Sequence, residues 1–443
     1  MKITFILPAI GKKPGKKYIG TWKMEPITIS MLKALTPPRY ETEFFDDRIE
    51  LIDYNIETDV VAITLETYTA LRGYDIAAKF KARGKKIIFG GYHATLCPDE
   101  AMEHGDCVIT GNAETVWEQA LTDCENGVMK QRYDGKAGYA SVHPDYSIYA
   151  NKKYLPITLV ETGRGCNHNC EFCAISTYYC SRYIPRQHED IIAELKQSKH
   201  KYHFLVDDNL TANREHAMGL FEKMKSLKIK WAGQGTLAIA NDPEMLKAMK
   251  SSGCELILIG FESLDEYNLK QMNKSWEIIL GERDKLVENI HKAGIGIYAT
   301  FVFGFDGDNE QTFADALAFA KKHKFYTCAF NHLLPFPGTA TYNRLKNENR
   351  LLYDKWWLER DYRYGELAFK PAQMTHERIS SLCRDTRRSF ARLPTVLSRG
   401  IASMKRNSLA IWWLFWMMNL RLGEEIDQKM NVPLGGNLDE WPK

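Results

Sequence analysis

Short apolar runs alternate with longer amphipathic stretches along most of the chain. In its first part the apolar runs predict strands, and a helical periodicity such as that of residues 70–84 separates them. The predicted strands are residues 2–8, 40–47, 60–66, 85–91 and 107–111. Strands that alternate with helices are typical of an α/β fold with a parallel, doubly wound sheet, which we expect over residues 1–127.

A second alternation follows a stretch without clear periodicity. Residues 128–155 are rich in Gly, Tyr, Asp and Asn, which indicates a linker. The next predicted strands are residues 156–163, 202–208, 229–235, 255–263, 295–305 and 327–336. Six strand–helix repeats predict a partial (β/α)6 barrel of the TIM type over residues 156–345, with its chemistry in loops after the strands. Beyond it we expect a helical C-terminal region, residues 346–443.

The ends of the first five strands carry small and acidic residues. Ligands of doubly wound sheets bind beyond the carboxyl ends of the strands. Those ends carry Pro8, Asp46, Asp47, Glu66, Gly90, Gly91 and Gly111. Glycine has no Cβ, so Gly90 and Gly91 would let the backbone approach a ligand closely. We therefore expect a binding cleft at this edge of the sheet.

Charge and cysteine content narrow the class of protein. The chain has 59 basic and 56 acidic residues and no dense basic block beyond GKKPGKK near its start, so a dedicated nucleic-acid surface is not indicated. The first ten residues are too short for a signal-peptide core and predict a buried strand. Ten cysteines without a secretory signal favour metal binding or catalysis in a reducing cytoplasm over disulfides.

One apolar stretch lies near the end of the chain. Residues 409–418 are ten unbroken apolar residues, whereas a helix that spans a bilayer needs about 20. A buried core helix is the simplest interpretation. A helix in a membrane interface, or one that lines an apolar substrate pocket, stays open, because tryptophans and the flanking Arg406 and Arg421 suit either. We expect the C-terminal region to close the mouth of the barrel.

Three cysteines stand close together after the first barrel strand. Cys166, Cys170 and Cys173 are spaced as C-x3-C-x2-C, and no second cysteine pair lies at matching distance. A structural zinc site needs four ligands, and His168 or Cys180 could supply the last one. Zinc sites usually come as two pairs, however. An iron–sulfur cluster with one iron free of protein ligands therefore fits this spacing better.

This loop resembles the C-x3-C-x2-C signature of the radical S-adenosylmethionine (SAM) superfamily, where an aromatic residue such as Phe172 usually precedes the third cysteine. The resemblance implies that Cys166, Cys170 and Cys173 hold a [4Fe–4S] cluster whose fourth iron chelates SAM. It also implies reductive cleavage of SAM to a 5′-deoxyadenosyl radical that abstracts hydrogen from substrate. The electron would come from an external donor of the flavodoxin or ferredoxin type.

The same resemblance assigns SAM contacts to other strand ends. Asp207, Asp208 and Asn209 would lie near the methionine moiety, Gln234 and Glu262 would contact the ribose or amino-acid part, and Gly304 would flank the adenine. Residues 335–342, PFPGTATY, resemble the PGT segment after the sixth strand. Ordinary barrel packing or turn formation is the alternative for each of these residues.

The order of the two predicted sheets resembles the cobalamin-binding class of the superfamily, with a Rossmann-like domain ahead of the barrel. Residues 90–102 match its GG-x-H-x-T run and imply contacts from Gly90, Gly91 and His93, although a surface or cap role for His93 is equally open. Residues 109–121 match its G-E-x-E run in part, with Gly111 and Glu114. The Asp-x-His-x-x-Gly motif that supplies a histidine to cobalt is absent, so the resemblance implies cobalamin without that ligand.

Taken together, the resemblance predicts an enzyme that uses SAM and cobalamin to methylate an unactivated carbon of a small or lipid-like substrate. An oxidative cyclase or ring-rearranging enzyme with the same cofactors, as in the anaerobic magnesium-protoporphyrin monomethyl ester cyclase family, is the alternative. A non-enzymatic iron–sulfur or cobalamin carrier or sensor is the third possibility. A tRNA methylthiotransferase is disfavoured, because Cys97, Cys107 and Cys124 do not form an obvious second cluster motif. A peripheral membrane contact stays open.

Overall fold

The computed structural model describes residues 1–19, 23–140 and 142–440, and it divides them into two compact units. Unit 1 consists of Met1–Leu155, Lys355–Tyr364 and Asn431–Lys443. Unit 2 consists of Pro156–Asp354 and Gly365–Met430. All eleven strands that the apolar pattern predicts are present, five in unit 1 and six in unit 2.

Unit 1 contains a six-stranded parallel sheet in the order β2-β1-β3-β4-β5-β6. Its strands are β1 (Lys2–Leu7), β2 (Glu41–Asp46), β3 (Val60–Thr64), β4 (Lys86–Gly90), β5 (Cys107–Gly111) and β6 (Arg132–Gly135). The strand order reverses between β1 and β3, which defines a topological switch point. The sheet is therefore doubly wound, as the sequence predicts.

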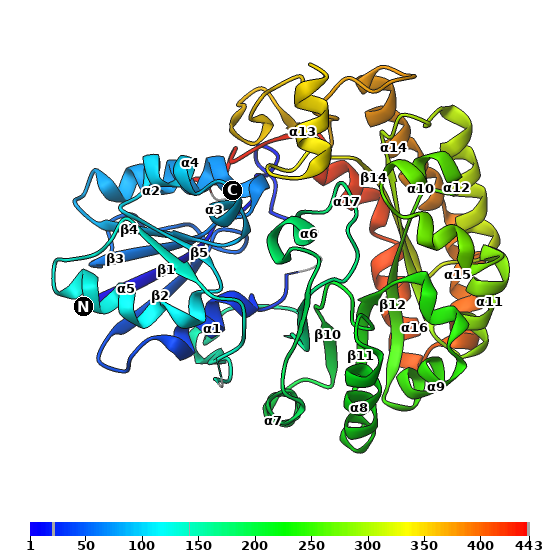
Figure 1. Ribbon diagram of the computed structural model, residues 1–443, viewed down its shortest axis with the longest axis horizontal. Coiled ribbons are helices and arrows are strands. Elements are labelled where there is room, and N and C mark those ends of the chain that lie inside the picture. Colours follow the sequence, from blue (N-terminus) through cyan, green and yellow to red (C-terminus); the bar gives the residue numbers. More distant parts are fainter. Residues whose placement is uncertain (20–22, 141, 441–443) are drawn as a thin grey trace. The chain divides into compact units, whose positions relative to one another are not determined.

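Helices cover both faces of this sheet. They are α1 (Ile27–Leu35), α2 (Ala70–Lys81), α3 (Tyr92–Leu96), α4 (Pro98–His104) and α5 (Trp117–Glu125). Helices α1 and α5 lie on one face, where Ile29 and Trp117 pack against Phe5, and α2 and α4 lie on the other (Figure 1). Apolar residues on both sides of the strands are the physical reason for the continuous apolar runs in the sequence.

Two parts of unit 1 differ from the predicted domain boundaries. Residues 128–155, predicted to be a linker, contain β6, which pairs with β5 at the edge of the sheet. This strand leaves no apolar run, because Tyr133 is its only buried residue. Residues 355–364 and 431–443 belong to unit 1 rather than to a separate C-terminal region, and β15 (Arg363–Tyr364) pairs there with β16 (Val432–Pro433).

Unit 2 contains a second six-stranded parallel sheet, in the order β7-β10-β11-β12-β13-β14. The strands are β7 (Ile157–Val160), β10 (Tyr202–Leu205), β11 (Lys230–Gly235), β12 (Cys254–Glu262), β13 (Gly296–Phe303) and β14 (Thr327–His332). Each strand lies next to the one before it, without reversal, as in a singly wound barrel. The partial barrel is therefore present, and a short antiparallel ribbon of β8 (Gly163–Gly165) and β9 (Tyr183–Pro185) follows its first strand.

The helices of unit 2 include one after nearly every barrel strand. These are α6 (Ala174–Tyr179), α7 (His188–Gln197), α8 (Arg214–Met224), α9 (Pro243–Ser251), α10 (Glu266–Gln271), α11 (Arg283–Lys292), α12 (Glu310–Lys322) and α13 (Ala340–Asn347). Four further helices complete the unit: α14 (His376–Phe390), α15 (Leu393–Arg406), α16 (Leu409–Asn419) and α17 (Leu422–Lys429).

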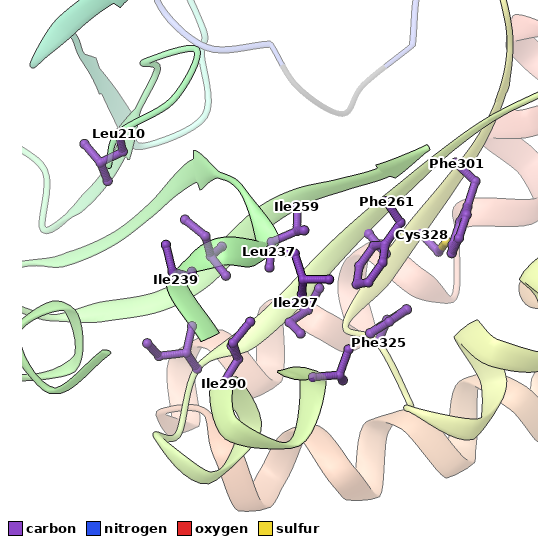
Figure 2. Close-up of a cluster of buried hydrophobic side chains, with 14 of the residues drawn as sticks. Leu210, Leu237, Ile239, Ile259, Phe261, Ile290, Ile297, Phe301, Phe325 and Cys328 are labelled. Atoms are coloured by element: carbon purple, nitrogen blue, oxygen red, sulfur yellow. The ribbon is translucent and has the colours of Figure 1, made fainter. Parts of the chain in front are cut away.

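The core of unit 2 lies between the strands and the surrounding helices. Strand residues alternate along β12 and β13 between fully buried and partly exposed, which is the period of two expected for a sheet with distinct faces. Figure 2 shows part of this core, in which Phe261 stacks on Phe301 at 5.6 Å and lies 5.4 Å from Phe325. The partly exposed faces are left for the interior of the barrel.

The apolar helix α16 lies at the end of the barrel where the strands begin. The Tyr326 hydroxyl donates to the carbonyl of Ile411 at 2.7 Å, and Tyr202 and Leu256 pack against the cluster that contains Phe415. Tyr326 immediately precedes β14, Tyr202 is the first residue of β10, and Leu256 is the third residue of β12. The expectation that this segment closes the mouth is therefore wrong, because its apolar inner face fills the apolar opposite end. None of the described helices is long and apolar enough to cross a membrane.

We predict that two adjacent glycines at the end of β4 respond differently to alanine. Gly91 has φ +96 and ψ −178, and a Cβ there would lie 2.6 Å from the Leu65 carbonyl oxygen. Gly91→Ala should lower the free energy of unfolding by about 3 kcal/mol, through backbone strain and overpacking. At Gly90 the nearest atom would be 3.9 Å away, so Gly90→Ala should change it by less than about 1 kcal/mol. Denaturant unfolding measures both, and equal effects would contradict this interpretation.

Candidate active site

The three cysteines lie in one loop between β8 and α6, and the backbone before them is tightly constrained. Gly165 immediately precedes Cys166 and has φ +79. A Cβ at this position would lie 2.1 Å from the carbonyl oxygen of Arg182, because β8 pairs with β9. Only glycine fits this approach, which fixes where the loop begins.

Two carboxylates at the end of β10 hold the start of the loop. Asp207 accepts hydrogen bonds from the backbone N–H and the hydroxyl of Thr162, both at 2.7 Å. Asp208 accepts from the N–H of Gly165 at 2.9 Å. Burial raises the pKa of Asp207 to about 7 and that of Asp208 to about 6, since both lie where a charge is poorly solvated.

These bonds give Asp207 and Asp208 an anchoring role that the sequence did not reveal. Asp207 is 1% exposed and both of its oxygens bind Thr162, so it contacts the loop rather than open space. The proposed contact between Asp208 and SAM stays a prediction. Asn209 extends the same row, and its Nδ2 lies 3.7 Å from Sγ of Cys166.

The environment of the cysteines suits thiolates that are bound to metal. The three side chains are partly buried and unpaired with one another as disulfides. Burial raises the pKa of Cys170 to about 12, so the thiolate needs a positive charge such as iron beside it. Within the described residues, no three His, Cys, Asp or Glu side chains gather closely enough to hold one metal ion. A cluster imposes a different requirement, because each thiolate binds its own iron.

The far side of the loop rests on the segment after α10. The Glu171 N–H donates to the carbonyl of Met272 at 3.1 Å, and Asn273 Nδ2 donates to the carbonyl of Asn169 at 2.7 Å. The ring of His168 stacks on Trp276 at 4.0 Å. His168 therefore takes part in loop packing, and this contact accounts for it without a metal.

A buried lysine ties this segment to the end of β12. Lys274 Nζ lies 3.7 Å from Oε1 of Glu262, 2.9 Å from Oε2 of Glu277 and 2.7 Å from the carbonyl oxygen of Gly260. Burial lowers the pKa of Lys274, but the two carboxylates outweigh this and raise the pKa above its usual value. Burial raises the pKa of Glu262, and Lys274 opposes that shift. The pair holds a carboxylate in place at the C-terminal end of the barrel, where Cys170 also lies within electrostatic reach.

The remaining predicted SAM positions also lie at strand ends of unit 2. Gln234, near the end of β11, donates from Nε2 to the carbonyl of Asp208 at 3.1 Å. Gly304 follows β13 with φ +122, and its N–H donates to Asp308 at 2.7 Å. In the PFPGTATY segment, the Thr341 N–H donates to the carbonyl of Glu171 at 3.2 Å. The structure thus connects the PGT segment to the cysteine loop, and the ligand contacts stay predictions.

The predicted cofactor glycines of unit 1 have structural explanations in two of three cases. A Cβ at Gly91 would meet Leu65, and a Cβ at Gly111 would lie 2.3 Å from the carbonyl oxygen of Gly135. At both positions a carbonyl oxygen of a neighbouring segment leaves no room for a side chain, so packing alone explains the glycine. A Cβ at Gly90 would lie 3.9 Å from the carbonyl oxygen of Ile109, an ordinary contact, so no neighbouring strand requires glycine at this position.

His93 and the acidic pair at the end of β2 lie inside unit 1. His93 is fully buried, and its Nε2 lies 3.0 Å from Oε1 of Glu100, so the alternative of a surface histidine is wrong. Asp46 binds Arg48 at 2.7 Å, and Asp47 binds Arg72 at 2.9 Å. These two carboxylates are therefore neutralised within the unit. Glu114 lies half-buried in a short 3-10 helix, Ala113–Thr115, and the roles of Glu114 and His93 towards a cofactor stay predictions.

Sequence reasoning missed Lys274 and Thr162. Lys274 lies twelve residues after Glu262, and no periodicity marks it as a buried partner. The one available signal is its place between two carboxylates and beside Trp276, over whose ring its ammonium lies at 5.5 Å. Thr162 gives no signal, because its partner Asp207 is brought to it by the parallel pairing of β7 and β10.

Comparison with known proteins identifies the family of this chain. Residues 160–320 match the radical SAM superfamily. The chain is 31% identical over 413 residues to bacteriochlorophyllide d C-12(1)-methyltransferase of Chlorobaculum tepidum, which covers 89% of this chain and 88% of that protein. It is 28% identical over 355 residues to bacteriochlorophyllide d C-8(2)-methyltransferase of the same organism, over 74% of this chain and 78% of that protein.

A solved structure shares the fold. The radical SAM methyltransferase TsrM of Kitasatospora setae, with cobalamin and a [4Fe–4S] cluster bound, matches with a TM-score of 0.60 at 13% identity over 78% of each chain. The prediction of an enzyme of the radical SAM type is confirmed, and this family uses SAM and a [4Fe–4S] cluster. The chain belongs to the radical SAM superfamily, and within it to the methyltransferases that include the bacteriochlorophyllide d C-12(1)-methyltransferase.

Proposed function

We propose that the protein transfers a methyl group to an unactivated carbon of a large, mainly apolar molecule such as a tetrapyrrole. The observation that carries this proposal is the cysteine loop, which is held at the C-terminal end of a barrel in a chain that also has a doubly wound sheet. The two bacteriochlorophyllide methyltransferases support the substrate class.

Radical chemistry suits such a substrate because an unactivated C–H bond offers neither an acidic proton nor a leaving group. With a [4Fe–4S] cluster bound by Cys166, Cys170 and Cys173, reductive cleavage of SAM supplies a 5′-deoxyadenosyl radical, and cobalamin supplies the methyl carrier. The electron comes from an external flavodoxin- or ferredoxin-type donor. The chain's own task is to position these groups and to keep water away.

The Glu262–Lys274 pair is the best-defined positioning element for SAM. Lys274 fixes the Glu262 carboxylate at the mouth of the barrel, beside the cysteine loop. A carboxylate held there accepts charge-assisted hydrogen bonds from an ammonium or from ribose hydroxyls, each of which contributes about 1.5–3 kcal/mol. Gln234 and Asp208 lie on the neighbouring strand ends and offer further polar atoms.

The residues of unit 1 fit a cobalamin that receives no histidine from the protein. The switch point between β1 and β3 is where doubly wound sheets bind their ligands. His93, the histidine closest in sequence to these strand ends, is fully buried, and its Nε2 lies 3.0 Å from Oε1 of Glu100, which disfavours it as a ligand of cobalt. Packing within the unit does not require glycine at Gly90, so close approach of a ligand to its backbone is one reason for a glycine there.

An oxidative cyclase with the same cofactors is the second candidate, since the geometry at the cysteine loop serves both reactions. The products distinguish them. Incubation with SAM, a reductant and bacteriochlorophyllide d should give a product that is heavier by one CH₂ unit if methyl transfer occurs. A product without this gain would favour cyclisation. A carrier or sensor is disfavoured, because it has no use for a carboxylate fixed at the mouth of the barrel.

We predict that replacing Cys166, Cys170 and Cys173 together by alanine abolishes iron binding and SAM cleavage, because each thiolate holds one iron. Iron content, absorbance and 5′-deoxyadenosine formation under anaerobic conditions measure the effect. Cys180→Ala is the matched control, since this cysteine lies seven residues further on but is exposed and outside the loop. A triple variant that keeps its full cluster content would overturn the assignment.

We predict that Glu262→Gln weakens SAM binding about ten- to a hundredfold while cluster content and melting temperature stay nearly constant. Lys274→Met should also weaken SAM binding. In addition, it should lower the free energy of unfolding by about 3 kcal/mol, because Glu262 and Glu277 lose their counter-charge.

The control for the lysine is Lys270→Met, at an exposed residue whose pairing with Glu266 at 4.0 Å contributes little. Binding is measured by equilibrium titration of cluster-loaded protein. If Glu262→Gln left SAM affinity unchanged and lowered the melting temperature, the carboxylate would serve only to hold the rim of the barrel.

We predict cobalamin uptake without a protein nitrogen on the cobalt. The electron paramagnetic resonance spectrum of the Co(II) form should show no nitrogen superhyperfine splitting from the lower face, and His93→Gln should leave that spectrum unchanged. Clear nitrogen coupling would contradict the ligand assignment. A protein that takes up no cobalamin at all would contradict the cofactor itself.

A further inference from the structure

Exposed apolar side chains concentrate in one short part of unit 2. Among the described residues, thirteen large apolar side chains are exposed, and eight of them lie between Leu393 and Leu420. These are Leu393, Leu397, Ile401 and Met404 on α15, and Leu409, Trp413, Met417 and Leu420 on or just after α16. Scattered single apolar residues are normal on a protein surface, whereas a group of this size marks an interaction site.

The spacing of the eight residues places them on one face of each helix. On both helices they follow one another at intervals of four, four and three residues, which is the repeat of a helical stripe. The opposite faces are buried, through Val396 and Ala402 on α15 and through Ile411 and Phe415 on α16. Each helix therefore uses one face to hold the fold and presents a second apolar face outward.

The two helices are locked side by side. Trp412 Nε1 donates to the carbonyl of Gly400 at 2.9 Å, and a Cβ at Gly400 would lie 2.4 Å from the Trp416 ring. The turn between the helices is fixed to the barrel, because the Ser408 N–H donates to Oε2 of the buried Glu255 at 2.9 Å. Buried Arg399 joins them further by donating to Asn419 at 2.8 Å. The exposed apolar stripes thus belong to a rigid pair of helices.

Basic residues predominate along these two helices. From Thr386 to Gly423 the chain has seven basic residues and no acidic residue, and exposed Asp385 and Glu424 border this range. Arg392, Lys405 and Arg421 are exposed and lie at the ends of the two helices. Glu255, the acidic residue bound at the turn, is itself neutralised by Lys230 at 2.7 Å.

We propose that α15 and α16 together form a docking surface for an anionic lipid bilayer, here named the α15–α16 surface. The eight outward apolar side chains enter the boundary between headgroups and acyl chains, and Trp413 is suited to that depth. Arg392, Lys405 and Arg421 reach the lipid phosphates from the ends of the helices. The helices lie in the plane of the membrane surface, since α16 has only 11 residues.

A second copy of the chain fits this surface less well. In a symmetric dimer the same patch meets itself, so Arg392, Lys405 and Arg421 would approach their own counterparts. Neither helix has an acidic side chain to pair with them, and like charges brought together oppose association. An anionic bilayer satisfies both the apolar and the basic part of the surface.

The α15–α16 surface lies at the end of the barrel opposite the cysteine loop. Its inner side contacts Tyr326 and Glu255, at the beginnings of β14 and β12, whereas Asp207 and Glu262 lie at or beyond the ends of their strands. Docking therefore leaves the C-terminal ends of the barrel strands uncovered. Membrane binding and SAM cleavage should respond to different substitutions.

Flotation of the full-length, cluster-loaded protein with vesicles tests the proposal. The protein should bind vesicles that contain about 30 mol% phosphatidylglycerol in phosphatidylcholine, bind vesicles of phosphatidylcholine alone at least about tenfold more weakly, and detach in part at about 0.5 M NaCl. Hydrogen–deuterium exchange should slow in peptides from residues 393–420 when anionic vesicles are added. No binding to anionic vesicles would overturn the proposal.

The double variant Ile401→Gln, Trp413→Gln should weaken vesicle binding at least about tenfold. The reason is that each apolar side chain that leaves water for the lipid contributes to the free energy of binding. Both residues are more than half exposed, at 59% and 58%, so the fold should tolerate the change, and 5′-deoxyadenosine formation should stay unchanged. Val128→Gln, at a residue 64% exposed in unit 1, is the control and should bind as the unaltered protein does.

Removing the charges separates the two parts of the surface. Lys405→Ala with Arg421→Ala should abolish the preference for anionic over neutral vesicles, whereas Lys16→Ala with Lys17→Ala, in unit 1, should not. Light scattering of the protein alone should give a mass that does not change in the Ile401→Gln, Trp413→Gln variant. A dimer that dissociates in that variant would show that the surface binds a second copy, and the proposal would fail.

Discussion

The candidate site depends on the carboxylates at the end of β10. Asp207 and Asp208 together hold Thr162 and Gly165, which lie four residues and one residue before the cysteine loop. A loop of eight residues with three thiols has many conformations of its own, and the entropy lost on ordering it must be offset by contacts outside it. Buried, charge-assisted hydrogen bonds from a rigid strand supply that compensation, and they transmit the geometry of the barrel to the cysteines.

The barrel separates its two ends by polarity. At the ends of the strands lie carboxylates, amides and the cysteine loop, together with a lysine whose charge is balanced by Glu262 and Glu277. At their beginnings Tyr202 and Leu256 meet an apolar helix that closes the barrel. The polar groups that could take part in a reaction therefore lie at the C-terminal end of the strands, as is usual for parallel barrels. The other end of the barrel can contribute to stability and to contacts with other surfaces.

The sequence predicts local features well and distant ones poorly. The spacing of the cysteines is local, and most strands are visible in the sequence as apolar runs. The edge strand β6 was not predicted, because Tyr133 is its only buried residue. Gly91 stands where a ligand was expected, but the atom that excludes a side chain is the carbonyl oxygen of Leu65, just after the neighbouring strand β3. Lys274 gave only one weak signal, its place in the sequence between two carboxylates and beside Trp276, since its partners meet it only after folding. Non-local contacts decide such residues, and a pattern along the chain does not contain them.

Helix α16 shows how one apolar segment can serve two purposes. From the sequence, its ten apolar residues were compatible with a core helix, an interfacial helix or the wall of a pocket. In the structure these residues are divided between a buried face and an exposed face. Ile411 and Phe415 are sufficient to anchor the helix to the barrel, together with the hydrogen bonds of Tyr326 and Ser408. The outward face adds nothing to that anchoring, because its side chains remain exposed in the folded chain. An apolar face that stays exposed after folding gains free energy of transfer only by leaving water for another apolar environment. The basic residues at the ends of the helices favour an apolar environment with an anionic surface.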